Sequence, residues 1–249
     1  MNFKQHFKNS TLYQFLDPAA ARRWFSIWVL ANDENPARLA IIRDWPDEQT
    51  YGEWAVATER TTTADSKKGW GGDIGPAQGT EGWGPERYRE EFRRIENAEL
   101  FPWLAKELGP SAPTQVFLRY VDPRAGASPT TEGGTTLIDR LAADAPGNPG
   151  MEFLPAPGMP EEEGMAAIEA LLEFKPGEPV CWPLNMPRLF VHERCRQVIW
   201  CLSNFNRMSI GDAKAPMRDP VDLCRYMALA DLSHVGSGTW EGRPGRGVY

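Results

Sequence analysis

The chain has 249 residues, of which 41% are hydrophobic and 24% charged, and its formal net charge is -7. The length and the hydrophobic share are ordinary for a soluble globular protein and suffice for one sizeable core. The acidic balance argues against a protein that coats nucleic acid through bulk electrostatics, because phosphate binding depends on clustered Lys and Arg, so any DNA binding must be local, weak or assisted.

Three strands are predicted to open the fold. Residues 11–16 (TLYQFL) are rich in β-formers and stop at Asp17-Pro18, because proline cannot donate to a sheet ladder. The apolar runs at 24–31 and 37–45 follow, joined by the turn-rich sequence NDENP. Connections this short favour an antiparallel meander, since a parallel crossover needs a dozen or more residues.

A polar, glycine-rich stretch then separates these strands from the first long helix. Residues 51–84 show neither helical nor strand periodicity, which predicts a long loop or insertion. The helix begins at Pro85, with proline in its first turn and Tyr88, Phe92 and Ile95 at positions i, i+4 and i+7. Its arginine-rich opposite face is expected to be solvated.

The second half of the chain predicts strands alternating with helices. A strand at 115–121 (QVFLRYV) ends at Asp122-Pro123, like the first strand. The further elements expected are a short helix at 135–144, a strand at 151–157, a helix at 160–174, a candidate strand at 188–193, and helices at 195–205 and 219–234. Residues 1–235 are expected to form one domain, and 236–249 a flexible tail.

The cysteines and histidines indicate the redox state of the protein and the kind of metal site that it can form. The four cysteines are scattered without a CxxC pair and are predicted to be reduced. The three histidines lie far apart, so a metal, if present, is expected to be held by oxygen atoms. No apolar run approaches the ~20 residues of a membrane span, and the first residues lack a signal-peptide pattern, so we expect a cytosolic protein.

The order of these elements is that of a ribonuclease H-like fold. This fold class is α/β, with a mixed sheet of three antiparallel strands followed by alternating parallel strands and helices, flanked by helices. In it the first and fourth strands are parallel neighbours at the centre of the sheet. Asp17 and Asp122 each close one of those strands, so their side chains are expected to lie one strand spacing apart, about 4.8 Å.

Three acidic positions are candidates for metal chemistry. Two carboxylates one strand spacing apart repel each other unless a cation lies between them, and two-metal phosphodiester cleavage uses this arrangement. Asp222, in the first turn of the last helix, is the candidate third acid. Each also has a structural interpretation: Asp17 as the cap of a helical turn, Asp122 as a turn starter, and Asp222 as the third residue of a helix capped by Asp219.

Several segments together resemble the nuclease domain of tailed-phage large terminase subunits. The segments include LYQFLDPAAARRWFSIWVLA, QVFLRYVDPRAG and above all DPVDLCRYMALAD, in which an aspartate is followed by an apolar pair and Arg-Tyr. The similarity runs in order from about Leu12 to His234. It implies that Asp17, Asp122 and Asp222 bind metal, the implied cofactors being two Mg²⁺ or Mn²⁺ ions, and that Asp219 is a further or alternative ligand.

The resemblance also implies an activity and partners. It implies an endonuclease that cuts double-stranded DNA concatemers during phage genome packaging, in the cytoplasm of an infected or lysogenic bacterium. The chain lacks a G-x-x-x-x-G-K-[ST] loop, so we expect a nuclease domain that works with a separate ATPase motor, a small terminase subunit and a portal. Candidate DNA-contacting residues are Arg22, Arg23, Arg124, Lys214 and Arg218. Alternatives are a resolvase or transposase core, and a non-catalytic docking module.

Overall fold

The computed structural model describes residues 2–18, 24–46, 84–127, 134–158, 160–181, 184–205 and 218–236. The insertion predicted at 51–84 therefore lies outside the described residues except for Gly84. The same holds for the predicted tail beyond residue 236, and for the polar loop before the last helix up to residue 217.

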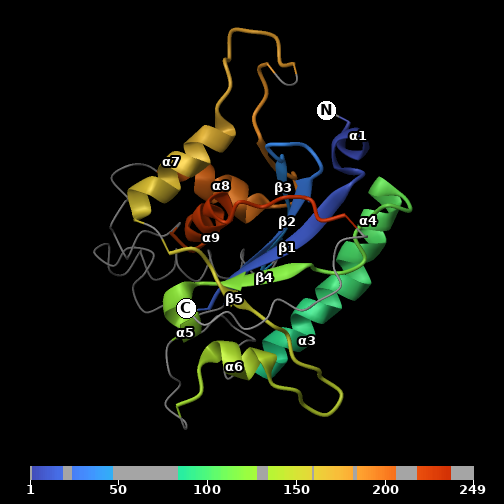
Figure 1. The fold of residues 1–249 in the computed structure, drawn as a ribbon, viewed down its shortest axis with the longest axis vertical. Coiled ribbons are helices and arrows are strands. Elements are labelled where there is room, and N and C mark those ends of the chain that lie inside the picture. Colours follow the sequence, from blue (N-terminus) through green and yellow to red (C-terminus); the bar gives the residue numbers. More distant parts are fainter. Residues whose placement is uncertain are drawn as a thin grey trace, which may run out of the picture.

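A mixed six-stranded sheet forms the centre of the described fold, in the order β5-β4-β1-β2-β3-β6 (Figure 1). The first three strands form the predicted antiparallel meander, and β4 pairs with β1 in parallel. At the two edges, β5 runs parallel to β4, and β6 runs parallel to β3. The strands are β1 (Ser10–Asp17), β2 (Phe25–Asn32), β3 (Leu39–Trp45), β4 (Leu118–Val121), β5 (Leu154–Pro155) and β6 (Leu189–Val191).

Helices cover both faces of this sheet (Figure 1). Among the described residues they are α1 (Phe3–Phe7), α3 (Pro85–Ile95), the π-helical turn η1 (Glu96–Leu100), α4 (Phe101–Leu108), α5 (Pro123–Ala127), α6 (Leu137–Ala142), α7 (Glu161–Leu172), α8 (Arg196–Asn204) and α9 (Arg218–Leu229). Helices α7, α8 and α9 pack on one face, and α3, η1 and α4 on the other. None of the helices in these ranges has the length and apolar character that a membrane span requires.

The alternation of side chains along β1 explains why the sheet is covered on both faces. Tyr13 and Phe15 belong to the hydrophobic core beneath α7, α8 and α9, whereas Leu12 and Leu16 belong to the core beneath α3 and α4. Successive side chains of a strand point to opposite faces, so an apolar strand of this kind needs a helical layer on each side. The result is a three-layer α/β architecture, as the element order predicts.

Several predicted boundaries differ from the structure. Helix α3 continues through η1 and α4 to Leu108, because Leu100, Leu104 and Leu108 extend its buried stripe. The strand expected at 151–157 is reduced to β5, and a short helix that is not among the predicted elements, α5, directly follows Asp122.

The last helix ends at Leu229, so the prediction that it continues to residue 234 is wrong. The chain instead returns along β1, where the Tyr13 hydroxyl donates to the carbonyl of Ser233 at 2.6 Å. The backbone N–H of Val235 donates to Thr11 Oγ1 at 2.8 Å. These hydrogen bonds with β1 take the place of a further helical turn. The helical periodicity of the sequence does not predict them.

Candidate functional site

Strands β1 and β4 are neighbours in the interior of the sheet, and their C-terminal ends lie side by side. Leu16 pairs with Val121, and the backbone N–H of Asp122 donates to the carbonyl of Leu16 at 2.9 Å. Asp17 and Asp122 are the next residues of their strands, so they lie at adjacent strand ends. The predicted parallel pairing of the first and fourth strands is confirmed.

Both acids belong to the face of the sheet that α9 covers. The rings of Phe15 and Tyr120 stack on this face, with centroids 5.0 Å apart and planes 17° apart. Because side chains two residues apart along a strand share a face, Asp17 follows Phe15 on this side, and Asp122 follows Tyr120. Helix α9 packs against β1 and β2 here through Leu223, Cys224, Tyr226 and Met227.

The Asp122 carboxylate caps the short helix that follows it. Oδ1 accepts hydrogen bonds from the backbone N–H groups of Arg124, at 2.9 Å, and Ala125, at 2.8 Å. Gly126 lets α5 fold directly back onto β4, because a Cβ there would lie 2.7 Å from Val121 Cγ1. The structural interpretation of Asp122 as a turn starter is therefore correct, and its second oxygen, Oδ2, points elsewhere.

Oδ2 of Asp122 accepts a hydrogen bond from the hydroxyl of Tyr226 on α9. Burial raises the pKa of this phenol, and so do the hydrogen bond and the negative charges of Asp122, Asp222 and Asp17. The phenol therefore stays protonated and remains a donor near neutral pH. All three predicted acids contribute to this raised pKa, but only Asp122 forms a hydrogen bond with the hydroxyl.

Tyr226 is a site residue to which sequence reasoning gave no role. The sequence places it in the apolar stripe of the last helix, together with Leu223 and Met227, and in the Arg-Tyr pair of the segment DPVDLCRYMALAD. Its spacing from Asp222 is the signal that could have found it, since residues at i and i+4 share one face of a helix. A tyrosine on the same face as a candidate metal ligand has a polar end that can reach other groups of the site.

Asp222 is held on its own helix by a neighbouring arginine. Its Oδ1 accepts from Arg225 Nη1, and the two side chains are 14% and 7% exposed. Gly164 on α7 makes room for the guanidinium, because a Cβ at that position would lie 2.8 Å from Arg225 Nε. Asp219, also in the first turn of α9, raises the pKa of the Cys201 thiol on α8, after the effects of burial and of Cys224.

A fourth acid on this face has a purely structural set of contacts. Asp44 on β3 is 2% exposed, and its Oδ2 accepts from the backbone N–H groups of Gln197, at 3.1 Å, and Val198, at 3.2 Å. It thereby satisfies N–H groups in the first turn of α8. Burial raises its pKa to about 6, against the opposing effect of these hydrogen bonds and of Arg43.

The donor set at the two strand ends suits a hard divalent cation. Asp17 and Asp122 place carboxylates at adjacent strand ends on one face, and Mg²⁺ usually takes one or two carboxylates, with waters and substrate phosphate completing its shell. Across the described ranges, no group of three or more His, Cys, Asp or Glu side chains is arranged to hold a metal ion. Asp222, the third predicted ligand, is paired with Arg225 in this structure.

The buried cysteines do not contribute to such a centre as thiolates. Cys195, Cys201 and Cys224 are buried and free, whereas Cys181 is free and exposed. Burial raises the pKa of each of the three buried thiols, that of Cys224 to about 12. They therefore remain protonated and pack as small apolar groups of the core.

The candidate DNA-contacting residues are only partly described. Arg124 is exposed and lies two residues beyond Asp122. Arg218 is the first residue of α9, but its side chain lies outside the described part of the chain. Arg22, Arg23 and Lys214 lie outside the described residues altogether. On α3, Arg87 and Arg94 form ion pairs with glutamates of the same helix, in keeping with a solvated face. The prediction is wrong for Arg89, which is 1% exposed and donates to the carbonyls of Leu141 and Ala143 near α6.

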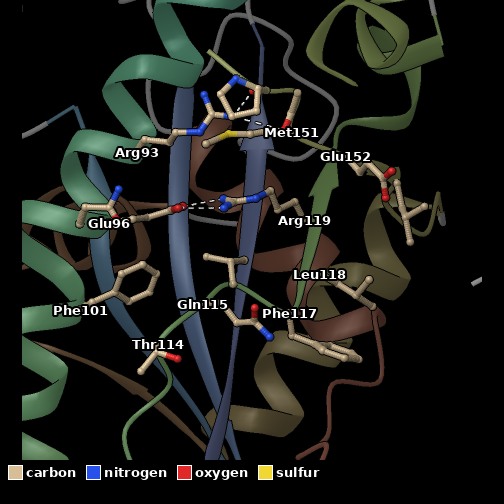
Figure 2. Close-up of a pocket in the computed structure, with 15 residues that line it drawn as sticks. Arg93, Glu96, Phe101, Thr114, Gln115, Phe117, Leu118, Arg119, Met151 and Glu152 are labelled. Atoms are coloured by element: carbon tan, nitrogen blue, oxygen red, sulfur yellow. Dashed lines mark hydrogen bonds and ion pairs between the residues drawn. The ribbon is translucent and has the colours of Figure 1, made fainter. Parts of the chain in front are cut away.

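A cavity of about 580 Å³ lies on the other side of the sheet, between η1 and β4 (Figure 2). In this cavity Arg119 donates to Glu96: Nη1 lies 2.5 Å from Oε1, and Nη2 lies 2.8 Å from Oε2. Because Arg119 precedes Tyr120 in β4, it points to the face opposite the carboxylates. This cavity therefore lies apart from the acids at the strand ends.

Comparisons with known proteins leave the family of the chain open. No family model matches it, and neither the curated proteins nor the solved structures include a significant match. What the chain does must therefore be inferred from its own side chains and from the way the sheet and α9 bring them together.

Proposed function

We propose that the chain is a divalent-metal-dependent DNA endonuclease domain with a ribonuclease H-like fold. The observation that carries the proposal is the parallel pairing of β1 with β4, which sets Asp17 and Asp122 at one edge and one face of the sheet. The antiparallel meander followed by parallel strands supports the fold assignment. Helix α9 supports the activity, because it carries Asp222 and also Tyr226, whose hydroxyl donates to Asp122.

Each acid has its own proposed role. Asp17 and Asp122 would hold a Mg²⁺ or Mn²⁺ ion, and Asp222 would join them by exchanging its contact with Arg225 for the ion, with Asp219 as the alternative ligand. When bound, such ions supply Lewis-acid activation of water and of the scissile phosphodiester; two ions are proposed. The exposed side chain of Arg124 would orient the DNA backbone next to Asp122.

The proposed substrate is double-stranded DNA, cut during phage genome packaging as the sequence resemblance implies. The ATPase motor, the small terminase subunit and the portal are proposed partners, as the same resemblance implies. The net charge of -7 favours weak DNA binding by the domain alone. Activity without partners is therefore expected to be modest and to fall as salt rises.

The test is nicking of a supercoiled plasmid by the full chain in Mn²⁺ or Mg²⁺. Asp17→Asn and Asp122→Asn each remove a negative oxygen ligand while keeping side-chain size, and should reduce nicking by about two orders of magnitude or more. Glu152→Gln is the matched control, because Glu152 is an exposed acid at the cavity on the opposite side. The control should nick like the wild type.

Two other functions give different outcomes in the same assay. A resolvase or transposase core would cut a four-way junction or a transposon end in strong preference to linear duplex. A non-catalytic docking module is favoured by the structural contacts of the acids, since Asp122 caps α5 and Asp222 pairs with Arg225. Equal behaviour of the wild type and Asp122→Asn in Mn²⁺ would reject the nuclease proposal and favour the docking module.

A further inference from the structure

Asp122 is held at both of its carboxylate oxygens. Oδ1 accepts from two backbone N–H groups of α5, those of Arg124 and Ala125. Oδ2 accepts from the Tyr226 hydroxyl, which reaches it from α9. The backbone contacts alone leave the plane of the carboxylate free to tilt about Oδ1, whereas the third contact, at the other oxygen, fixes its orientation.

Tyr226 is itself held firmly enough to orient another group. Tyr226 is 8% exposed and belongs to the hydrophobic core that α9 shares with β1 and β2. The guanidinium carbon of Arg225 lies 6.0 Å from the centroid of its ring, within the range of a cation–π contact. A ring held by packing on α9 places its hydroxyl at one point beside the end of β4.

A hydrogen bond from Tyr226 is compatible with metal binding by the same carboxylate. A carboxylate oxygen has two lone pairs, so Oδ2 can accept from the phenol and still coordinate a cation. Groups that hydrogen-bond to a metal ligand fix its orientation, and their loss typically costs on the order of 10- to 100-fold in metal affinity. Tyr226 has the contact and the rigidity for this role.

We infer that Tyr226 is a positioning residue for divalent-cation binding, orienting Asp122 beside Asp17 through its hydrogen bond to Oδ2. The inference rests on the proposed function, because it assumes that Asp122 binds a metal ion. It also gives α9 a second contribution to the site: the helix carries Asp222, and through Tyr226 it sets the geometry of an acid on β4.

The test is direct titration of the full chain with MnCl₂, by calorimetry and by the electron paramagnetic resonance signal of free Mn²⁺. Tyr226→Phe removes one hydroxyl and keeps the ring, and should raise the Kd for Mn²⁺ by about 10- to 100-fold. Tyr13→Phe is the matched control. It also removes a phenol hydrogen bond, the one to the Ser233 carbonyl, from the same hydrophobic core, and should leave the Kd unchanged.

Asp122→Asn separates failure of the inference from failure of the proposed function. If the wild type binds Mn²⁺ and Asp122→Asn does not, but Tyr226→Phe binds as tightly as the wild type or more tightly, the positioning role is wrong and the metal site stands. If the wild type and Asp122→Asn give the same titration, the metal site at Asp122 is wrong, and the inference is overturned with it.

Circular dichroism and urea unfolding show whether each variant is folded before it is titrated. Should Tyr226→Phe fail to fold, Tyr226→Met provides a second variant that keeps an apolar side chain on α9 and lacks the donor. The expected result is the same rise in Kd. An unchanged Kd in a folded Tyr226→Met variant counts against the positioning role as strongly as it would for phenylalanine.

Discussion

The hydroxyl of Tyr226 donates to the carboxylate of Asp122 across 104 residues of sequence. This contact ties the last helix to the end of β4, the central strand beside β1. The charges of three acids from separate segments raise the pKa of the same phenol, so the arrangement of the candidate centre depends on how α9 packs on the sheet. Contacts that determine this packing are therefore the ones to test.

Asp122 should have a stability role that is separable from activity. Asp122→Ala removes the acceptor for two N–H groups of α5 and leaves the buried phenol of Tyr226 without its acceptor. We expect it to lower the free energy of unfolding by about 1–3 kcal/mol. Asp122→Asn keeps a capping oxygen and should stay within about 1 kcal/mol of the wild type.

Urea unfolding followed by circular dichroism measures both variants. The two substitutions should thus differ in stability while both reduce metal-dependent nicking. A loss of stability in Asp122→Asn as large as that in Asp122→Ala would show that the negative charge, rather than the capping oxygen, stabilises this part of the fold.

Gly164→Ala should destabilise the protein although alanine favours helix. A Cβ at this position of α7 would lie 2.8 Å from Nε and 3.0 Å from Cβ of Arg225. Overpacking of this kind costs about 1–3 kcal/mol, against a helix-propensity gain of roughly 1 kcal/mol. We expect a net loss in the free energy of unfolding, measured by urea titration.

Gly177→Ala is the control for this substitution, because a Cβ there would meet nothing within 4 Å. The effect of Gly164→Ala should also shrink when Arg225 is already alanine, since part of the clash is with the arginine side chain. An equal effect in both backgrounds would place the strain elsewhere in α7.

Asp44 should make stability depend on pH between about 4 and 6. Its folded-state pKa, raised by burial from 3.8 to about 6, means that the folded state binds more protons than the unfolded state in this window. The contribution of this group therefore becomes less favourable as pH rises from 4 to 6, by on the order of 2–3 kcal/mol, and then levels off.

Asp44→Asn tests this dependence because asparagine can still accept from the N–H groups of Gln197 and Val198. The variant should gain stability relative to the wild type as pH rises from 4 to 7. Urea unfolding at several pH values measures the difference. A difference that is constant with pH would show that Asp44 titrates normally in the folded protein, and one that falls as pH rises would show that folding lowers its pKa.

Glu96 should matter for stability and not for the carboxylate site. It accepts from the indole N–H of Trp28 at 3.0 Å and from both Nη atoms of Arg119, and its side chain is 5% exposed. Glu96→Ala removes the acceptor of the indole N–H and of Arg119 Nη2, while Arg119 Nη1 keeps Gln14 Oε1 as an acceptor, and should cost about 3–5 kcal/mol. Glu96→Gln keeps one acceptor oxygen and should cost less.

Because Glu96 lies on the opposite face of the sheet from Asp17 and Asp122, Glu96→Gln should nick plasmid like the wild type once corrected for the folded fraction. Chemical unfolding and the nicking assay give the two readouts. A large loss of nicking in fully folded Glu96→Gln would mean that the two faces are coupled through β4.

The sequence by itself determined the first four strands and the places where two candidate acids occur. Proline directly after Asp17 and after Asp122 ends a strand, and short turns make the first three strands antiparallel. These are local signals, which is why they could be read in order along the chain. The start of α3 at Pro85 was predictable for the same reason.

Only the tertiary structure decided which hydrogen-bond partners the acidic side chains have. Asp44 caps a helix more than 150 residues away, with Val198 separated from it by 154 positions. Periodicity indicates the face on which a side chain lies, whereas its partner depends on how distant elements pack. The same limit hid Tyr226: its helix stripe was readable from the sequence, but its contact with Asp122 exists only because α9 folds over the ends of β1 and β4.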